Sequence, residues 1–105
     1  MKIEKIKKSE QPGCVVGIGS SAGGLEALQQ FFTFLPADTG MAFVVIQHLS
    51  PDHRSLLADI LGKYTTMPVM EAQDGMHVRK NTVYMLPPKY NMEIEGGVLH
   101  LYEYN

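Results

Sequence analysis

The feature that most constrains the fold is a glycine-rich run, residues 17–24, at the junction of two differently patterned segments. Before it, residues 14–18 form a short apolar run that predicts a buried strand. After it, residues 24–35 place apolar side chains at helical spacing, with polar residues on the other face, and Pro36 ends the helix. A strand that passes through such a turn into a helix is typical of α/β proteins.

The same order then repeats. Residues 41–46 predict a second buried strand, and Ser50 is the expected N-cap of a second helix, with Pro51 at the first helical position. The apolar stripe of this helix is Leu56, Leu57, Ile60, Leu61 and Tyr64. Strand, helix, strand, helix in this order predicts a parallel sheet with right-handed crossovers.

The pattern changes after Pro68. Short strands are expected at residues 69–72, 82–86, 91–95 and 98–102, separated by the turn signals Asp74-Gly75, Pro87-Pro88 and Gly96-Gly97. The last two form a predicted hairpin across Gly96-Gly97, so we expect an antiparallel addition. The predicted fold class is therefore α/β, doubly wound, with a parallel βαβα start followed by short strands and a hairpin.

Composition excludes several classes. The chain has 105 residues, 45% of them hydrophobic and 19% charged, which is globular usage, and its net charge of −2 gives no basic footprint for nucleic acid. No stretch approaches the ~18 apolar residues that span a bilayer, and no secretory signal is present. The single cysteine, Cys14, suits a reducing compartment and is expected in the core. We therefore expect a cytoplasmic protein without membrane insertion.

Three interpretations of the glycine-rich run stay open. As a dinucleotide loop it has the wrong spacing, because Gly17, Gly19 and Gly23 give G-x-G-x-x-x-G. As a nucleophile elbow, Gly19 to Gly23 satisfies G-x-S-x-G with Ser21 as the nucleophile, and Gly19, Ala22 and Gly23 shape the turn and its oxyanion hole. As a purely structural turn, its serines only cap the helix.

A serine nucleophile needs a base, and His48 follows the second predicted strand. Adjacent parallel strands end at the same edge of a sheet, where ligands bind in open α/β folds, so we expect His48 beside Ser21. His53, His77 and His100 are interpreted as solvated. His48, Asp52 and His53 lack the spacing of a zinc motif, so neither metal nor cofactor is expected.

These residues carry a family resemblance. The run from Gly17 to Leu28 resembles the opening of the catalytic domain of CheB-type chemotaxis protein-glutamate methylesterases. Further similar motifs follow in the same order, namely Leu35-Pro36, Gln47 to Pro51, Glu71 to Gly75 and Val83 to Pro88. The match is strongest to the catalytic domain found in fusions with the partner methyltransferase.

The resemblance implies a Ser-His-Asp hydrolase that cleaves γ-glutamyl methyl esters on the cytoplasmic segments of chemoreceptors, often with deamidation of receptor glutamines. It maps the nucleophile onto Ser21 and the base onto His48, with Ser20 a less favoured nucleophile. Ala22 stands where the family often has threonine. The expected partners are chemoreceptors, the remainder of the domain, or a methyltransferase domain.

The triad aspartate of the family belongs to a downstream glycine-rich motif that these residues do not contain. We therefore expect residues 14–105 to be the N-terminal portion of the domain, behind a flexible leader at residues 1–13 that is too short for a receiver domain. Alone, such a portion is expected to be inactive or weakly active. A non-catalytic interaction fragment and a nucleotide-binding module are the alternatives.

Overall fold

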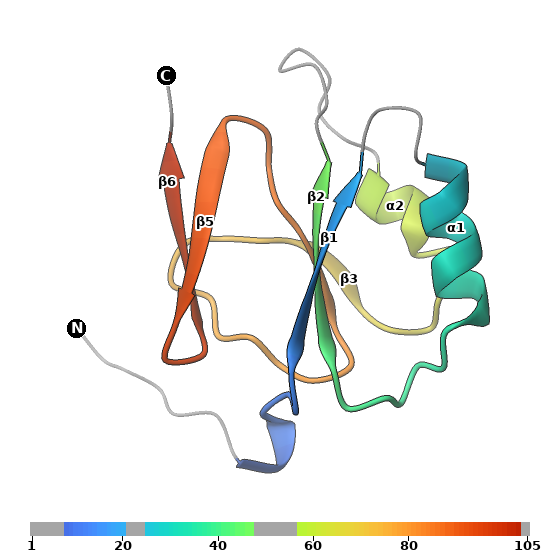
Figure 1. The fold of residues 1–105 in the computed structure, drawn as a ribbon, viewed down its shortest axis with the longest axis horizontal. Coiled ribbons are helices and arrows are strands. Elements are labelled where there is room, and N and C mark those ends of the chain that lie inside the picture. Colours follow the sequence, from blue (N-terminus) through green and yellow to red (C-terminus); the bar gives the residue numbers. More distant parts are fainter. Residues whose placement is uncertain (1–7, 21–24, 48–56, 104–105) are drawn as a thin grey trace.

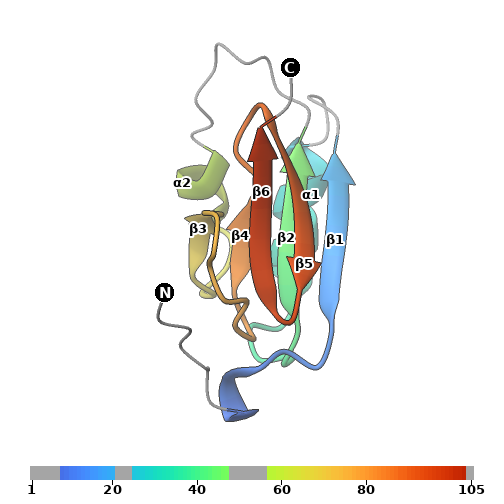
Figure 2. The ribbon, with the colours of Figure 1, turned by 90° about the vertical axis from the view of Figure 1, so that its left-hand side faces the viewer.

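The computed structural model describes residues 8–20, 25–47 and 57–103, which build three layers. A parallel sheet lies in the middle, two helices cover one face, and a hairpin covers the other (Figures 1 and 2). The elements are η1 (Lys8–Glu10), β1 (Val15–Ser20), α1 (Leu25–Phe34), β2 (Ala42–Gln47), α2 (Leu57–Leu61), β3 (Val69–Glu71), β4 (Val83–Met85), β5 (Tyr90–Glu95) and β6 (Val98–Glu103). None of these helices is long and apolar enough to cross a membrane.

The sheet has four strands in the order β1-β2-β4-β3, and every neighbouring pair is parallel. The predicted α/β class with a parallel start is confirmed, but the antiparallel addition is only β5 and β6. The prediction that β3 and β4 belong to the antiparallel addition is wrong, because both strands join the parallel sheet. The crossover between them, residues 72–82, contains no helix and bonds to the hairpin instead, with Val78 N donating to Gly97 O at 2.9 Å. A crossover without helical periodicity carries no sequence signal for parallel pairing.

Apolar residues alternate between two cores, one on each face of the sheet. In β2, Phe43 and Val45 pack with Leu28 and Phe32 of α1 on the helix side. Ala42 and Val44 instead pack against the hairpin side, where Tyr84 and Leu99 lie. Because both faces are covered, β2 is an unbroken apolar run, as predicted.

The predicted turns form where glycine is required. Gly96 (φ 59°) and Gly97 (φ 78°) both have positive φ and join β5 to β6 through a two-residue loop, as a type I′ hairpin turn needs. Gly75 (φ 82°) lies in the Asp74-Gly75 turn. The Asp74 side chain accepts a hydrogen bond from Leu101 N at 2.9 Å, which attaches this turn to β6.

Among the described residues β1 lies at the edge of the sheet, and the prediction that it is a buried strand is wrong on one face. Val16 and Ile18 pack on the helix-side core, whereas Val15 is 36% exposed and Gly17 and Gly19 are also exposed. The hairpin packs on the middle strands of the sheet, and its residues Ile94, Gly96 and Gly97 line a cavity together with Val15 of β1. Cys14, which immediately precedes this edge strand, is likewise exposed and not part of the core.

Both helices form on the predicted stripes, and the described residues place α1 at Leu25–Phe34 and α2 at Leu57–Leu61. In α1, Leu28 and Phe32 are buried, as predicted. The expected start of the second helix at residues 50–52 lies outside the described residues. Tyr64, predicted as the last member of its stripe, lies in the turn after α2 and is 41% exposed.

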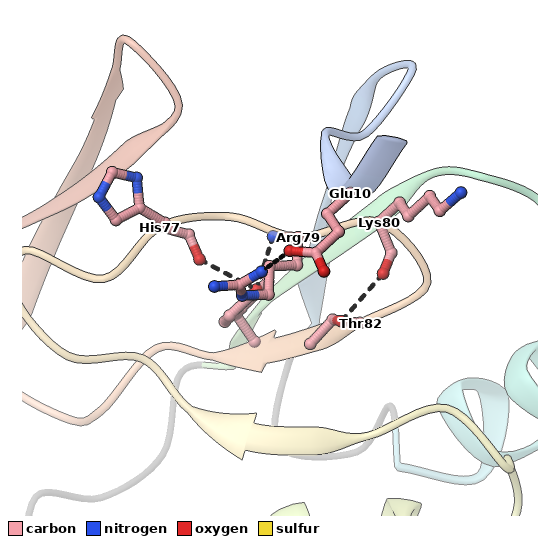
Figure 3. Close-up of polar contacts among 6 residues, drawn as sticks. Glu10, His77, Arg79, Lys80 and Thr82 are labelled. Atoms are coloured by element: carbon pink, nitrogen blue, oxygen red, sulfur yellow. Dashed lines mark hydrogen bonds and ion pairs between the residues drawn. The ribbon is translucent and has the colours of Figure 1, made fainter. Parts of the chain in front are cut away.

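The segment before β1 is attached to the sheet at its amino edge. Glu10 forms an ion pair with Arg79, and its carbonyl accepts a hydrogen bond from Lys80 N at 2.9 Å (Figure 3). Gly13 N donates to Gly40 O, also at 2.9 Å. Residues 8–13 of the predicted leader therefore contact the domain, and residues 1–7 lie outside the described residues. The two side chains of the ion pair are 49% and 44% exposed, so its contribution to stability is small.

A buried tyrosine connects the sheet to the same loop. Tyr84 is 1% exposed, and its hydroxyl accepts a hydrogen bond from Arg79 N at 2.8 Å and donates one to His77 O at 3.3 Å. Replacing Tyr84 with phenylalanine removes both bonds and keeps the ring. We expect this substitution to lower the free energy of unfolding by about 1–2 kcal/mol, because a backbone N–H loses its partner. Chemical denaturation measures the change.

The matched control is Tyr102→Phe on β6, where the side chain is 51% exposed. That substitution is expected to change the free energy of unfolding by less than about 0.5 kcal/mol. Equal effects at the two tyrosines would contradict a stabilising role for the buried hydroxyl.

Candidate active site at the carboxyl edge of the sheet

The carboxyl ends of β1 and β2 meet at one edge of the sheet. The two strands are parallel and in register along their whole length, from Val15 opposite Ala42 to Ser20 opposite Gln47. Both strands therefore end at the same level, and their last residues are neighbours (Figure 1). In open α/β sheets this edge is where ligands bind.

The principal predicted site residues follow directly after these strand ends. Ser21, Ala22, Gly23 and His48 all lie outside the described residues. The structure describes the residues that precede them in the sequence, since Ser20 is the last residue of β1 and Gln47 is the last residue of β2. α1 begins at Leu25. Residues 21–24, which join β1 to α1 in the sequence, lie outside the described residues.

Gly19 is the one predicted site residue that the structure describes. It lies inside β1, opposite Ile46, and not in the turn itself. A Cβ atom added at Gly19 would meet no atom within 4 Å, and its φ is not in the left-handed region. A larger side chain at position 19 would therefore fit both the surrounding space and the backbone conformation of the described residues. The role of Gly19 in an oxyanion hole stays a prediction.

The pairing of β4 extends one residue beyond Met85, and a residue with positive φ follows three positions later. Leu86 N donates to Val45 O at 3.0 Å, which continues the β4 pairing beyond Met85 toward the strand ends. Past this bond, Lys89 has φ 70°, an uncommon conformation for a side chain other than glycine, and it is exposed. The Pro87-Pro88 pair was the available signal, but it predicted only a turn.

Two cavities lie away from the strand ends. One of about 390 Å³ lies between the C-terminal part of α1 and the segment after α2, lined by Phe32, Thr33, Leu35, Ala37 and residues 62–66. Another of about 320 Å³ lies beside Val15, His77 and Ile94, at the start of β1. Within the described ranges, no three His, Cys, Asp or Glu residues are grouped to hold a metal ion.

The four-stranded parallel sheet with helices on one face places the chain in the α/β class of proteins. The CheB methylesterase family model matches residues 16–105, most of the chain. The chain belongs to the CheB methylesterase family, a family of hydrolases named for chemotaxis.

Relatives agree with this assignment. The chain is 36% identical over 93 residues to protein-glutamate methylesterase/protein-glutamine glutaminase 2 of Methanosarcina acetivorans, covering 89% of this chain and 26% of the relative. It is 37% identical over 82 residues to the Oceanobacillus iheyensis protein of the same type, covering 78% of this chain and 23% of the relative. The chain thus spans about a quarter of the length of these relatives.

A solved structure shows the same fold. The CheB methylesterase catalytic domain of Thermotoga maritima superposes with a TM-score of 0.72 at 31% identity. The match covers 85% of this chain and 48% of that one. The described sheet and helices therefore correspond to about half of a methylesterase catalytic domain.

Proposed function

We propose that this chain carries the nucleophile and the base of a protein-glutamate methylesterase, with Ser21 as nucleophile and His48 as base. The observation that carries the proposal is the pairing of Ser20 with Gln47 at the ends of two parallel strands. Each proposed catalytic residue follows one of these partners by a single peptide unit, which spans about 3.8 Å between Cα atoms. Family membership and the printed name of the relatives support the substrate class.

The proposed chemistry is acyl transfer in two steps. Ser21 Oγ attacks the carbonyl carbon of a γ-glutamyl methyl ester while His48 takes the hydroxyl proton, and His48 then returns that proton to the departing methoxide as methanol leaves. Water hydrolyses the acyl-enzyme by the same route in reverse, which frees the serine and leaves glutamate. With a glutamine side chain as substrate, the leaving group is ammonia and the reaction is deamidation.

Negative charge that develops on the carbonyl oxygen needs donors. Backbone N–H groups of the turn at Ala22 and Gly23 are the proposed oxyanion donors, with Gly19 at its entry. The turn precedes α1, and the N-terminal end of a helix favours negative charge. Electrostatic stabilisation of this kind usually accelerates acyl transfer more than any other single effect.

We further propose chemoreceptor cytoplasmic segments as the protein substrate and the cytoplasm as the compartment. The single cysteine and the resemblance to chemotaxis methylesterases support this pair of proposals. Residues 14–105 are proposed as part of the catalytic domain, with its triad acid supplied by residues outside 1–105.

The proposal is tested by covalent labelling of the chain with a fluorophosphonate, which reacts with activated serines. We expect the adduct on Ser21, located by tandem mass spectrometry, because only a serine beside a base is activated. His48→Ala is expected to slow labelling by a factor on the order of 10². The matched control is His100→Ala on β6, which is expected to leave the rate unchanged.

Labelling at Ser20 instead of Ser21 would reassign the nucleophile. Equal labelling rates for the two histidine variants would contradict His48 as the base.

A further inference from the structure

The loop that joins β4 to β5 lies at the same edge of the sheet as the candidate site. β4 is parallel to β2, with Met85 opposite Val45, and the bond from Leu86 N to Val45 O extends the pairing by one residue. Residues 87–89 therefore leave the sheet beside the end of β2, on the side away from β1. Figures 1 and 2 show this connection reaching the start of β5 at the end of the molecule where β1 and β2 also finish.

The strand register limits the distance between this loop and the candidate site. Leu86 follows Met85 by one residue and lies beside Ile46, about 4.8 Å away at the usual strand spacing. Three residues of chain span at most about 11 Å, so the Cα atom of Lys89 lies within about 16 Å of that of Ile46. A protein segment with one side chain at the candidate site therefore has neighbouring residues within reach of the long Lys89 side chain.

Lys89 has a backbone conformation that lysine rarely adopts. Its φ is 70°, in the left-handed region, where the Cβ atom of an L residue is crowded. The two residues before it are Pro87 and Pro88, and each proline ring fixes its own φ near −65°. The loop thus presents Lys89 from a restricted backbone, and strained conformations of this kind cluster at functional sites.

The other positive-φ residues of the described chain have a structural explanation. Four are glycines, which have no Cβ atom to crowd. The fifth, Asn81 (φ 57°), accepts a hydrogen bond from Gly40 N on its side-chain oxygen at 2.7 Å, so its amide joins two turns. Lys89 is exposed, and no hydrogen bond or ion pair between described residues accounts for a lysine at this position.

Lys89 also supplies positive charge at this edge. Among the described residues, every other lysine or arginine comes before a strand of the parallel sheet, and hence toward its amino edge: Lys8, Lys63, Arg79 and Lys80. An ammonium group offers three hydrogen-bond donors and no acceptor, so the ligand that it selects is an anion.

We propose that Lys89 is a specificity-determining residue, which binds a carboxylate of the protein substrate a few residues away from the side chain that reacts. The inference rests on the proposed function. The group that reacts is a neutral ester or amide, so the carboxylate belongs to another residue of the same segment. Both proposed reactions leave a glutamate carboxylate, and a segment with several reactive side chains therefore binds more tightly to Lys89 as the reaction proceeds.

Peptide binding to the complete catalytic domain tests the proposal, in a Ser21→Ala background so that the ester is not consumed. Two fluorescent peptides each carry a single γ-glutamyl methyl ester. The acidic peptide has glutamate at the second, third and fourth positions on each side of the ester, and the neutral peptide has alanine there. Fluorescence anisotropy at low ionic strength, where charge attraction is least screened, measures the dissociation constants. We expect the acidic peptide to bind about 3–10-fold more tightly.

Lys89→Ala is expected to remove most of this preference, by weakening the binding of the acidic peptide and leaving that of the neutral peptide unchanged. Lys89→Arg keeps the charge and is expected to keep the preference. The matched control is Lys63→Ala, because Lys63 is also exposed but lies in the turn after α2, toward the other edge of the sheet. This control is expected to leave both dissociation constants unchanged.

Lys89→Gly separates binding from stability. Glycine removes the charge and also the Cβ atom that is crowded at φ 70°. We expect this variant to lose the preference for the acidic peptide, while the midpoint of thermal unfolding of the domain stays the same or rises. A lower midpoint with the preference intact would assign Lys89 to the fold and overturn the proposal.

Equal binding of the two peptides by the domain that retains Lys89, or an equal loss of preference in Lys63→Ala, would also overturn it. Failure of the proposed function gives a different result. Absence of the Ser21 adduct in fluorophosphonate labelling would contradict the proposed nucleophile, whereas the dissociation constants are measured without turnover and decide the role of Lys89 separately.

Discussion

Replacing Ser21 with alanine is expected to lower methylester hydrolysis by a factor on the order of 10⁴ or more. The alanine variant has no hydroxyl to form the acyl-enzyme, and the histidine and oxyanion donors that remain cannot substitute for a nucleophile. The measurement is methanol release from a methylated chemoreceptor cytoplasmic fragment by the complete catalytic domain, with the alanine variant and the unchanged protein at equal concentration.

Ser20→Ala is the matched control. It removes the same hydroxyl group from the residue immediately before Ser21, which is the last residue of β1 and pairs with Gln47. We expect this variant to retain activity within about tenfold, because it leaves the Ser21 hydroxyl in place. Loss of activity in Ser20→Ala but not in Ser21→Ala would move the nucleophile by one residue.

Phe32→Ala is expected to reduce the free energy of unfolding by about 3–5 kcal/mol, which is a large part of the about 5–15 kcal/mol available to a domain of this kind. Phe32 is 1% exposed and lies between α1 and the sheet. Its ring is edge-on to that of Phe43, with centroids 5.8 Å apart, and also to that of Phe31, at 5.2 Å. Removing the ring leaves a cavity that the sheet and helix cannot close.

Phe34→Ala provides the comparison on the same helix. The side chain is 84% exposed, so the substitution is expected to change the stability of the monomer by less than about 0.5 kcal/mol. Urea denaturation followed by circular dichroism measures both variants. Similar losses in the two would contradict the assignment of Phe32 to the core.

Local patterns were sufficient for most elements of this fold. The helical spacing of Leu28 and Phe32 predicted α1, and the apolar run at residues 41–46 predicted β2 within one residue at each end. Gly96-Gly97 predicted the hairpin, because a two-residue turn between strands requires positive φ at both positions. These features depend only on residues close together in the chain.

Strand pairing was less predictable. The strands at Val69–Glu71 and Val83–Met85 were found in the sequence, but their parallel pairing was not, since the crossover between them contains no helix. The exposure of Cys14 and Val15 was missed for a related reason. An apolar strand has the same pattern at the centre and at the edge of a sheet, and only the neighbours in space differ.

The candidate site likewise depends partly on local patterns and partly on strand pairing. Ser21 was identified from a strand, a glycine-rich turn and a helix that are contiguous in the chain, and His48 from its place after the next strand. Their proposed pairing rests on a fact that no local pattern contains, the alignment of Ser20 with Gln47 across two strands 27 residues apart in the chain.

Sequence alone therefore determined which segments are helix, strand and turn, because those preferences arise within a few residues of backbone. The tertiary structure decided that β1 lies next to β2 and that its other edge is unpaired among the described residues. The physical reason is that hydrogen bonds between strands join distant residues, and any strand offers the same donors and acceptors to each possible neighbour.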